Sequence, residues 1–199
     1  DDGGDAFRID IRTLALASVA AYTIDARLVN ANGAVVLNAD ATRMAYSINE
    51  IINAAGDRGD RTYVNDLGTG ALLARIDDAE EPAFVDTGEL LLRRGERLHV
   101  YDSQLRDQGA LPITVSATAG AFSASPDGRY VAHETGSRIS MLDRNSGLSW
   151  FVTSLQPRGS YGPVFSPDGQ WLALFYEGSV AGRYLHIIRF RPGVTVTID

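Results

Sequence analysis

Short apolar runs separated by polar turns make up most of the chain. The runs last about four to eight residues, as strands do, and they do not repeat at the three- and four-residue spacing of an amphipathic helix. The segments 98–102 and 171–176 are two such runs. This pattern predicts an all-β fold built of short antiparallel strands.

Two segments of the chain repeat each other closely. Residues 124–132 and 165–173 each contain Ser-Pro-Asp-Gly followed by an apolar strand, and their glycines, Gly128 and Gly169, lie 41 residues apart. Weaker copies are centred on Gly88, 40 residues before Gly128, and on Ala41, 47 residues before Gly88. Four short strands in every repeat of this length are typical of a β-propeller blade. The repeat therefore predicts a propeller of four-stranded antiparallel blades.

The repeats predict about four to five visible blades in a single propeller domain or propeller fragment. The expected units are a partial blade at 1–27 and blades at 28–76, 77–111, 112–153 and 154–199. The last blade is expected to have a third strand from Tyr184 to Phe190 and a fourth from Val194 to Ile198. A closed five-bladed ring and a piece of a larger propeller both remain open. We favour the piece, whose unpaired edges need a partner.

Aspartates recur at the predicted turns. Asp127 and Asp168 belong to the Ser-Pro-Asp-Gly turns, whereas Asp66, Asp102 and Asp143 follow the third strands in register. We expect all of them to be structural, because aspartate bonds the local backbone of a turn. The aspartates that follow the third strands occupy equivalent positions on successive blades, and such positions are too far apart for two of these aspartates to act as a catalytic pair. The histidines His99, His133 and His186 fall on separate strands, so we expect no metal site.

The Phe-Ser-Pro-Asp-Gly-x-x-Leu-Ala pattern at 165–173 resembles the WD-repeat-like units of bacterial TolB-type propellers. The same unit occurs in the propeller domains of prolyl-oligopeptidase relatives. The resemblance is close over 112–199, weaker over 77–111 and weakest before that. The pattern departs from the family at Asp40-Ala41 and Asp86-Thr87-Gly88, where the proline is missing. The resemblance implies a propeller in a periplasmic or otherwise extracytoplasmic setting.

Composition excludes several chemistries. The 199 residues carry a formal net charge of -7, contain no cysteine, and have arginine at all 18 basic positions. Thiol catalysis, cysteine-ligated metals, lysine Schiff bases and P-loop nucleotide binding are therefore excluded, and the acidic balance argues against nucleic acid as a partner. No serine-hydrolase elbow, zinc-protease helix motif, dinucleotide-binding glycine motif or calcium loop is present. We expect no catalytic residues, no cofactor and no bound metal.

The most apolar run, Leu14 to Ile24, is about half the roughly 20 residues that a membrane-spanning helix needs. Its composition is like that of a signal-peptide core, but aspartates precede it where a signal peptide has positive charge. We expect a strand or a short helix here and no transmembrane segment.

Two segments are expected to be loops that contact a partner. One is the insertion at 51–61, with Asp57, Arg58, Asp60 and Arg61, and the other is 177–183, bounded by Glu177 and Arg183. Binding residues concentrate on loops held by a rigid scaffold. The leading hypothesis is a non-catalytic protein-interaction scaffold of the bacterial envelope, with another chain completing the propeller as one form of partner. The alternatives are a propeller that gates substrate access for a hydrolase or peptidase, and a propeller that binds a sugar or small ligand.

Overall fold

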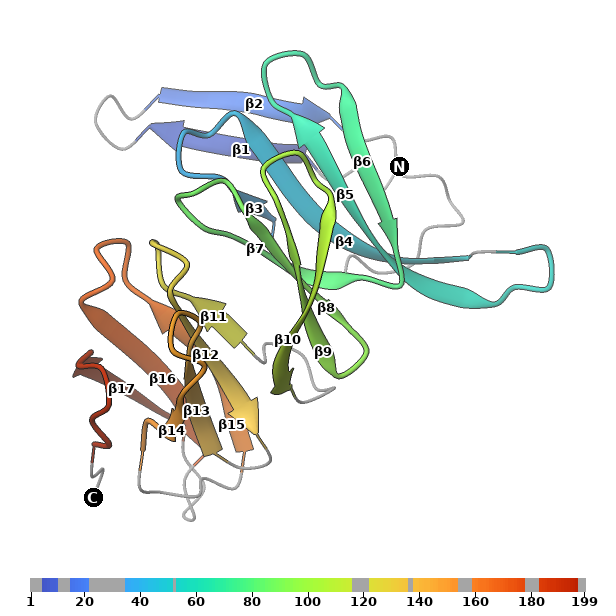
Figure 1. The fold of residues 1–199 in the computed structure, drawn as a ribbon. Helices are drawn as coiled ribbons and strands as arrows, with labels where there is room; N and C mark the ends of the chain where they lie inside the picture. The colour runs from blue at the N-terminus through green and yellow to red at the C-terminus, as the bar shows by residue number, and fades with distance from the viewer. Residues whose placement is uncertain are drawn as a thin grey trace. The chain divides into compact units, whose positions relative to one another are not determined.

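The computed structural model describes residues 5–10, 15–21, 35–51, 53–115, 122–135, 138–153, 159–177 and 183–196. The chain divides into two compact units, residues 1–82 and 83–199. Every regular element in the described residues is a β-strand (Figure 1). The all-β prediction is confirmed, and the described residues contain no helix that could span a bilayer.

The first unit contains an antiparallel pair of strands and a four-stranded antiparallel sheet. The pair is β1 (Asp5–Asp10) and β2 (Ala15–Ala21), so the apolar run after residue 14 forms a strand. The sheet has the order β3-β4-β5-β6, with strands β3 (Val36–Leu37), β4 (Arg43–Ile51), β5 (Arg58–Asp66) and β6 (Leu72–Asp77). Strands β4 and β5 pair without interruption along nine residues each and form the long hairpin of Figure 1.

The second unit contains three sheets in which chain order and spatial order agree. The first sheet, whose initial strand spans the boundary between the units, consists of β7 (Glu80–Phe84), β8 (Leu90–Arg94), β9 (Arg97–Tyr101) and β10 (Asp107–Thr114). The next consists of β11 (Phe122–Ala124), β12 (Tyr130–Thr135), β13 (Arg138–Asp143) and β14 (Ser149–Phe151). The last consists of β15 (Gly159–Phe165), β16 (Trp171–Glu177) and β17 (Arg183–Arg189). Such up-and-down sheets are the architecture of propeller blades.

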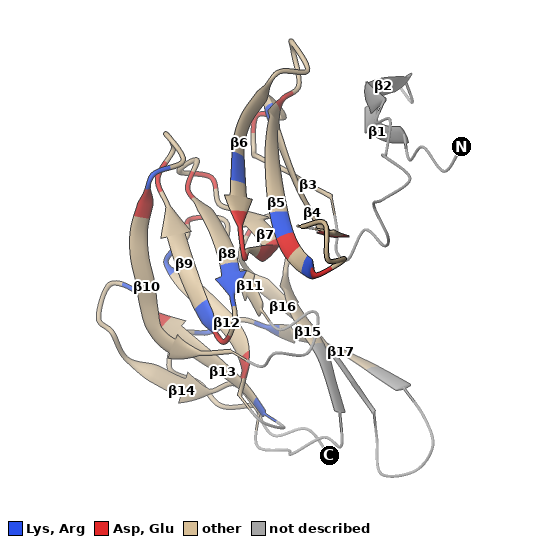
Figure 2. Cartoon of the chain, turned by 90° about the vertical axis from the view of Figure 1, so that its right-hand side faces the viewer, with Lys and Arg blue, Asp and Glu red and all other residues tan. Residues whose placement is uncertain are grey.

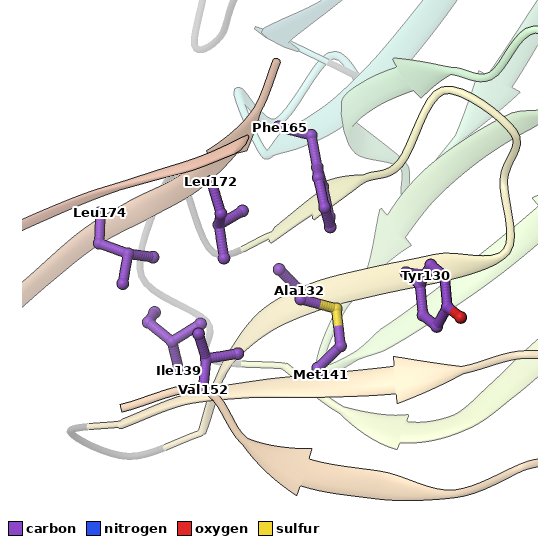
Figure 3. Packing of buried hydrophobic residues seen from close by; sticks show 8 residues of the cluster. All are labelled: Tyr130, Ala132, Ile139, Met141, Val152, Phe165, Leu172 and Leu174. Carbon is purple, nitrogen blue, oxygen red and sulfur yellow. The ribbon is translucent and has the colours of Figure 1, made fainter. Parts of the chain in front are cut away.

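Apolar side chains from both faces of a sheet build the core of the second unit. Strands β8 and β12 are buried at four and five consecutive positions, so neither face of these strands meets solvent. One buried cluster joins the β7–β10 sheet to the β11–β14 sheet, with Leu91 and Leu98 packed near Val131 and Leu142. The other joins the β11–β14 sheet to the β15–β17 sheet (Figure 3). Each sheet therefore needs an apolar neighbour on both of its faces.

The expected fourth strand of the last blade is wrong for the described residues. The sheet there has three strands, and Val196 makes one parallel bridge with Thr153, just after β14 of the preceding sheet. The amide of Val196 donates to the carbonyl of Val152 at 2.8 Å. The turn at Pro192 and Gly193, where Gly193 has φ of 73°, directs the chain to that strand. A positive φ is accessible to glycine at little cost.

Candidate functional site

The segment 51–61, expected to be a loop, is in part strand, which corrects its predicted conformation at Arg58, Asp60 and Arg61, whereas its expected contact with a partner stays a prediction. Strand β5 already begins at Arg58, and the pairs Glu50–Gly59 and Asn49–Asp60 continue the β4–β5 ladder. Asp57 alone of the four candidates lies between the two strands, where its carboxylate accepts a hydrogen bond from Nδ2 of the Asn53 side chain at 2.7 Å. The insertion therefore lengthens a hairpin, because its polar residues pair across two strands.

Charged side chains on this hairpin form ion pairs with one another and with the neighbouring strand β6. Arg61 forms an ion pair with the buried Glu50 and a second one, at 2.7 Å, with Asp77 of β6. The hydroxyl of Tyr63 donates to Glu50 at 2.6 Å, and burial raises the pKa of Tyr63. The bands of opposite charge on β5 are visible in Figure 2. Arg61 is thus a structural cation, whereas Asp57 and Arg58 keep exposed side chains at the end of the hairpin.

The second candidate loop is bounded as expected, and its ends face each other. Glu177 ends β16, Arg183 begins β17, and the two residues are backbone partners. Residues 178–182 between them lie outside the described residues, as do the side chains of Glu177 and Arg183. Their expected role in partner binding stays a prediction.

The Ser-Pro-Asp-Gly segments form the predicted turns. The aspartates of the two turns, Asp127 and Asp168, have the same bonds. In each of them Oδ1 accepts a hydrogen bond from the hydroxyl of the turn serine and another from the backbone amide two residues after the aspartate. Gly128 and Gly169 have φ of 71° and 68°, a region that favours glycine. The structural role of these two aspartates is confirmed.

The aspartates that follow the third strands have equivalent bonds. Asp66 accepts from the Thr69 amide at 2.7 Å, and Asp102 accepts from the Gln104 amide at 2.9 Å. Asp143 accepts from the Asn145 amide and also pairs with Arg129 at 2.9 Å, which lowers the pKa of Asp143 to about 2. The expectation that these residues close turns in register is confirmed.

A cavity of about 690 Å³ lies between the two Ser-Pro-Asp-Gly turns and the end of β17. The residues that line it include Asp86, Asp127 and Asp168, together with Arg189 and Tyr130. Three prolines and Phe190 add apolar surface. This volume is within the range of about 300–1,000 Å³ that ligand sites occupy. Sequence reasoning assigned Asp127 and Asp168 to turns but missed the cavity, because the wall combines residues from three separate turns and a strand end.

The histidines fall on different strands, as predicted, and have different surroundings. His99 lies 3.1 Å from the carboxylate of Asp107, whereas His133 is 4% exposed and burial lowers its pKa to about 4. The Nε2 atom of His133 is buried without a hydrogen-bond partner. Within the described ranges no three metal-ligating side chains are grouped to hold an ion.

The outer side of the last sheet, which we call the terminal face, is apolar and exposed. It consists of Val164, Trp171, Ala173, Leu185 and Ile187, which lie on one side of β15, β16 and β17 according to the register. Exposure is 54% for Val164, 43% for Trp171, 50% for Leu185 and 63% for Ile187. The unbroken apolar run of β16 is the sequence signal for this face, since a strand without alternation is typical of burial on both sides.

Four of the five residues that match the terminal face in the preceding sheet are buried, and the fifth, Ser123, is half-buried. The repeat pairs Tyr130 with Trp171, and the two registers pair Met141 with Ile187 and Ile139 with Leu185. Tyr130, Ile139 and Met141 are only 8%, 5% and 0% exposed, because they pack against the β15–β17 sheet. The terminal face is therefore the kind of surface that another blade covers.

Solved structures with this fold are propellers. No protein-family model and no curated protein matches the sequence. TolB from Acinetobacter baumannii is similar with 22% identity and a TM-score of 0.61, over 90% of this chain and 44% of that one. An oligogalacturonate lyase in complex with manganese has 17% identity and a TM-score of 0.62, over 94% and 57%. The β-propeller domain of Cps50 (Swd1) from Myceliophteria thermophila has 12% identity and a TM-score of 0.54, over 81% and 54%.

These similarities define the class of fold, an all-β propeller architecture with TolB-like and WD40 neighbours. The chain spans about half the length of the solved propellers that it matches. Arrangement as part of a propeller is consistent with both the sheets and this coverage.

Proposed function

We propose that the chain is a non-catalytic protein-interaction scaffold of the bacterial envelope, and that its terminal face binds a further β-propeller blade of a protein partner. The exposure of the terminal face carries the proposal. Large contiguous apolar surfaces are uncommon on isolated soluble proteins and mark interaction sites. Ile187 and Val164 contribute the most exposed aliphatic positions of this surface.

The preceding sheets indicate what kind of partner fits. Phe165, Leu172 and Leu174 of the last sheet cover the Met141 side of the β11–β14 sheet. A partner that presents a similar aliphatic and aromatic row would cover Ile187 and Trp171 in the same way. Such a contact joins two sheets face to face, with the packing density of a protein interior.

The coverage of the solved propellers supports a blade as the partner. This chain covers only 44% of the TolB structure and 57% of the lyase structure. The envelope setting rests on the TolB-type repeat pattern at 165–173 and on the TolB neighbour.

The bonding of the turn carboxylates favours a scaffold over an enzyme. In both Asp127 and Asp168 the Oδ1 atom is held by the serine hydroxyl and the backbone of its own turn. A carboxylate in that position contributes to turn geometry, and catalytic acids or bases need a perturbed pKa near the working pH. The pKa of Asp168 is instead lowered, first by the bond from Ser166.

A second candidate function is small-ligand binding by the cavity of about 690 Å³ between the turns. A screen of sugars and other small ligands by thermal shift distinguishes the two functions, since a ligand that binds the folded chain raises its melting temperature. Saturable stabilisation without any protein partner would favour the small-ligand function.

Site-specific photo-crosslinking tests the scaffold. A benzoylphenylalanine placed at position 187, in cells that export the chain to the envelope, is expected to give a protein adduct that mass spectrometry identifies. Leu148, which is 68% exposed but lies outside the terminal face, is the matched control position. Adducts at neither position, or equally at both, would contradict a specific role for the terminal face.

A further inference from the structure

The last sheet has one strand fewer than the four-stranded sheets. Strand β17 forms its edge, because β17 pairs with β16 and with no other described strand. The matching strand of the preceding sheet, β13, has β14 on that side. Among the described residues the chain after Gly193 does not supply the missing strand, since Val196 bridges to Thr153 instead. An edge of this kind is a site where another strand can add.

The backbone groups that face away from the sheet belong to Leu185, Ile187 and Arg189. The amide of Phe190 donates toward β16, to the Gln170 carbonyl at 2.7 Å. Backbone groups of an antiparallel strand alternate between its two sides, so those of every second residue before Phe190 also face β16, and those of the residues between them face outward. No hydrogen bond joins the outward groups to the backbone of another described residue. We call this row of amides and carbonyls the β17 edge.

The preceding sheet shows how an equivalent edge is filled. The repeat and the registers match alternate residues of 139–143 in β13 with the three residues of the β17 edge. In that sheet the Val152 amide donates to the Ile139 carbonyl at 2.9 Å, and the Asp143 amide donates to the Leu148 carbonyl at 2.9 Å. The fourth strand, β14, is antiparallel to β13. The β17 edge presents the same alternation of donors and acceptors to solvent.

The apolar side chains beside the edge indicate what an added strand carries. In the preceding sheet Trp150 lies opposite Met141 and packs edge-on against Tyr130, at 6.2 Å between ring centroids. The matching residues of the last sheet are Ile187 and Trp171, which are 63% and 43% exposed. A bulky apolar side chain opposite Ile187 would contact both residues, as Trp150 does in its own sheet.

Arg189 adds a preference for charge at one end of the edge. Its counterpart Asp143 pairs with Arg129, but the residue that matches Arg129 is the uncharged Gln170. Arg189 is exposed and forms no ion pair with a described residue. An added strand would place a residue opposite Arg189, as Leu148 lies opposite Asp143. An acidic residue at that place complements the guanidinium.

We propose that the β17 edge binds an extended segment of a protein partner, which adds to the last sheet as an antiparallel fourth strand. The segment carries a bulky apolar residue opposite Ile187 and an acidic residue opposite Arg189. The inference rests on the proposed scaffold function, because the segment belongs to the partner, and it adds backbone pairing to the apolar packing of the terminal face. Main-chain hydrogen bonds provide the affinity of such strand addition, and alternate side chains provide the specificity.

A hexapeptide based on residues 148–153 tests the proposal on the full chain. The probe is Ac-Glu-Ser-Trp-Phe-Val-Thr-NH2, in which glutamate takes the first position. Amide hydrogen exchange of the protein is followed by NMR at rising peptide concentration. We expect exchange of the Ile187 and Arg189 amides to slow about tenfold or more at saturation. The amides of His186 and Ile188, which face β16, are expected to keep their exchange rates.

Backbone methylation of the probe separates strand pairing from apolar adsorption. In the register of β14 the tryptophan and valine amides of the probe face β17, whereas its phenylalanine and threonine amides face solvent. Methylation of the first two nitrogens is expected to abolish the protection, and methylation of the other two is expected to preserve it. The two methylated peptides have identical side chains, so equal effects of both would overturn the proposed pairing.

Charge reversal tests the orientation of the added strand. Arg189→Glu is expected to weaken binding of the probe about two- to fivefold, and to strengthen binding of a probe with lysine in the first position by a similar factor. Arg97→Glu is the matched control, because Arg97 is exposed at the start of β9 in another sheet and its substitution changes the net charge equally. The same loss in both variants would contradict an acidic residue opposite Arg189.

The outcomes distinguish this proposal from the scaffold function. Absence of protection at saturating probe overturns the strand site; if the crosslink at position 187 persists in that case, the scaffold function stands and the partner covers the terminal face without pairing with β17. If the probe pairs with β17 but the crosslink yields no protein, the scaffold function fails, whereas the β17 edge remains a site for an extended peptide. Protection of the Ile187 amide that rises with protein concentration alone would overturn a separate partner, because a second copy of the chain would then occupy the edge.

Discussion

Met141 and Ile187 occupy matching positions in the third strands of consecutive sheets, yet Met141 is 0% exposed and Ile187 is 63% exposed. Both side chains lie beside an alanine of the second strand, Ala132 and Ala173 respectively. The difference arises because the β15–β17 sheet covers Met141, whereas no described residue covers Ile187 to the same extent. The same repeat position is therefore core in one sheet and surface in the next.

This difference predicts unequal costs of truncation. Met141→Ala removes a fully buried side chain and is expected to lower the free energy of unfolding by about 2–5 kcal/mol. Ile187→Ala in the isolated chain is expected to change it by less than about 1 kcal/mol, because the side chain is mostly solvated. Urea unfolding of the two variants measures both values. A comparable loss in both variants would mean that Ile187 is covered in the isolated chain.

Two glycines with the same backbone geometry are predicted to tolerate alanine differently. Gly128 and Gly147 have φ of 71° and 72°, so both substitutions strain the backbone. A Cβ at Gly128 would lie 3.1 Å from Val85 and 3.3 Å from the Arg144 guanidinium, whereas a Cβ at Gly147 meets nothing within 4 Å. Gly128→Ala is therefore expected to lower the melting temperature more than Gly147→Ala. Differential scanning calorimetry measures this order, and the reverse order would contradict the packing at the first Ser-Pro-Asp-Gly turn.

The buried His133 predicts acid sensitivity. Its pKa is lowered to about 4 in the folded chain, compared with about 6.5 when unfolded, so the unfolded chain binds more protons between these values. Stability is therefore present above pH 6.5 and is lost as the pH falls toward 4, by roughly 3 kcal/mol for this group. His133→Leu, which introduces the residue found at the matching position 174, is expected to reduce the pH dependence in this window.

Urea unfolding at pH 7, 5.5 and 4.5 measures this dependence in both chains. Asp143 does not obscure it, because the pKa of Asp143 is lowered to about 2 by Arg129 and its contribution is lost only below about pH 4. Identical pH profiles for His133→Leu and the native chain would show that His133 is not the titrating group.

A buried hydroxyl relay in the first unit predicts a cost for losing one hydroxyl. The Oγ1 of Thr62 donates to the Ala79 carbonyl at 2.8 Å and lies 2.8 Å from the Ser47 hydroxyl, with Thr62 fully buried. Thr62→Val keeps the shape but leaves buried groups without a partner, at a cost of about 1–3 kcal/mol. Thr195→Val is the control, since the exposed Thr195 donates to the Phe151 carbonyl and its loss is expected to cost less. Thermal unfolding compares the two, and a larger effect of Thr195→Val would contradict the buried relay.

The local sequence predicted the turns well because their bonds are local. Asp168 and Gly169 form a tight turn from contacts within five residues, which a short motif contains completely. The strands after these turns were predicted for the same reason. The sequence predicts a loop at Arg58 and Asp60, which is wrong because both residues belong to a strand. The residues around them are polar, so this part of the hairpin lacks the alternation of apolar and polar residues by which a strand is recognised in a sequence.

The sequence by itself determined the all-β class, the repeat of about 40 residues and the structural role of aspartates such as Asp127 and Asp143, because these depend on periodicity and on bonds between near neighbours. Tertiary structure decided which face of each sheet is covered, where the chain after Gly193 pairs, and that Asp86, Tyr130 and Arg189 line one cavity. Those outcomes depend on packing between residues of different sheets, such as Leu98 with Val131 and Met141 with Leu172, and packing brings them together only when whole sheets stack.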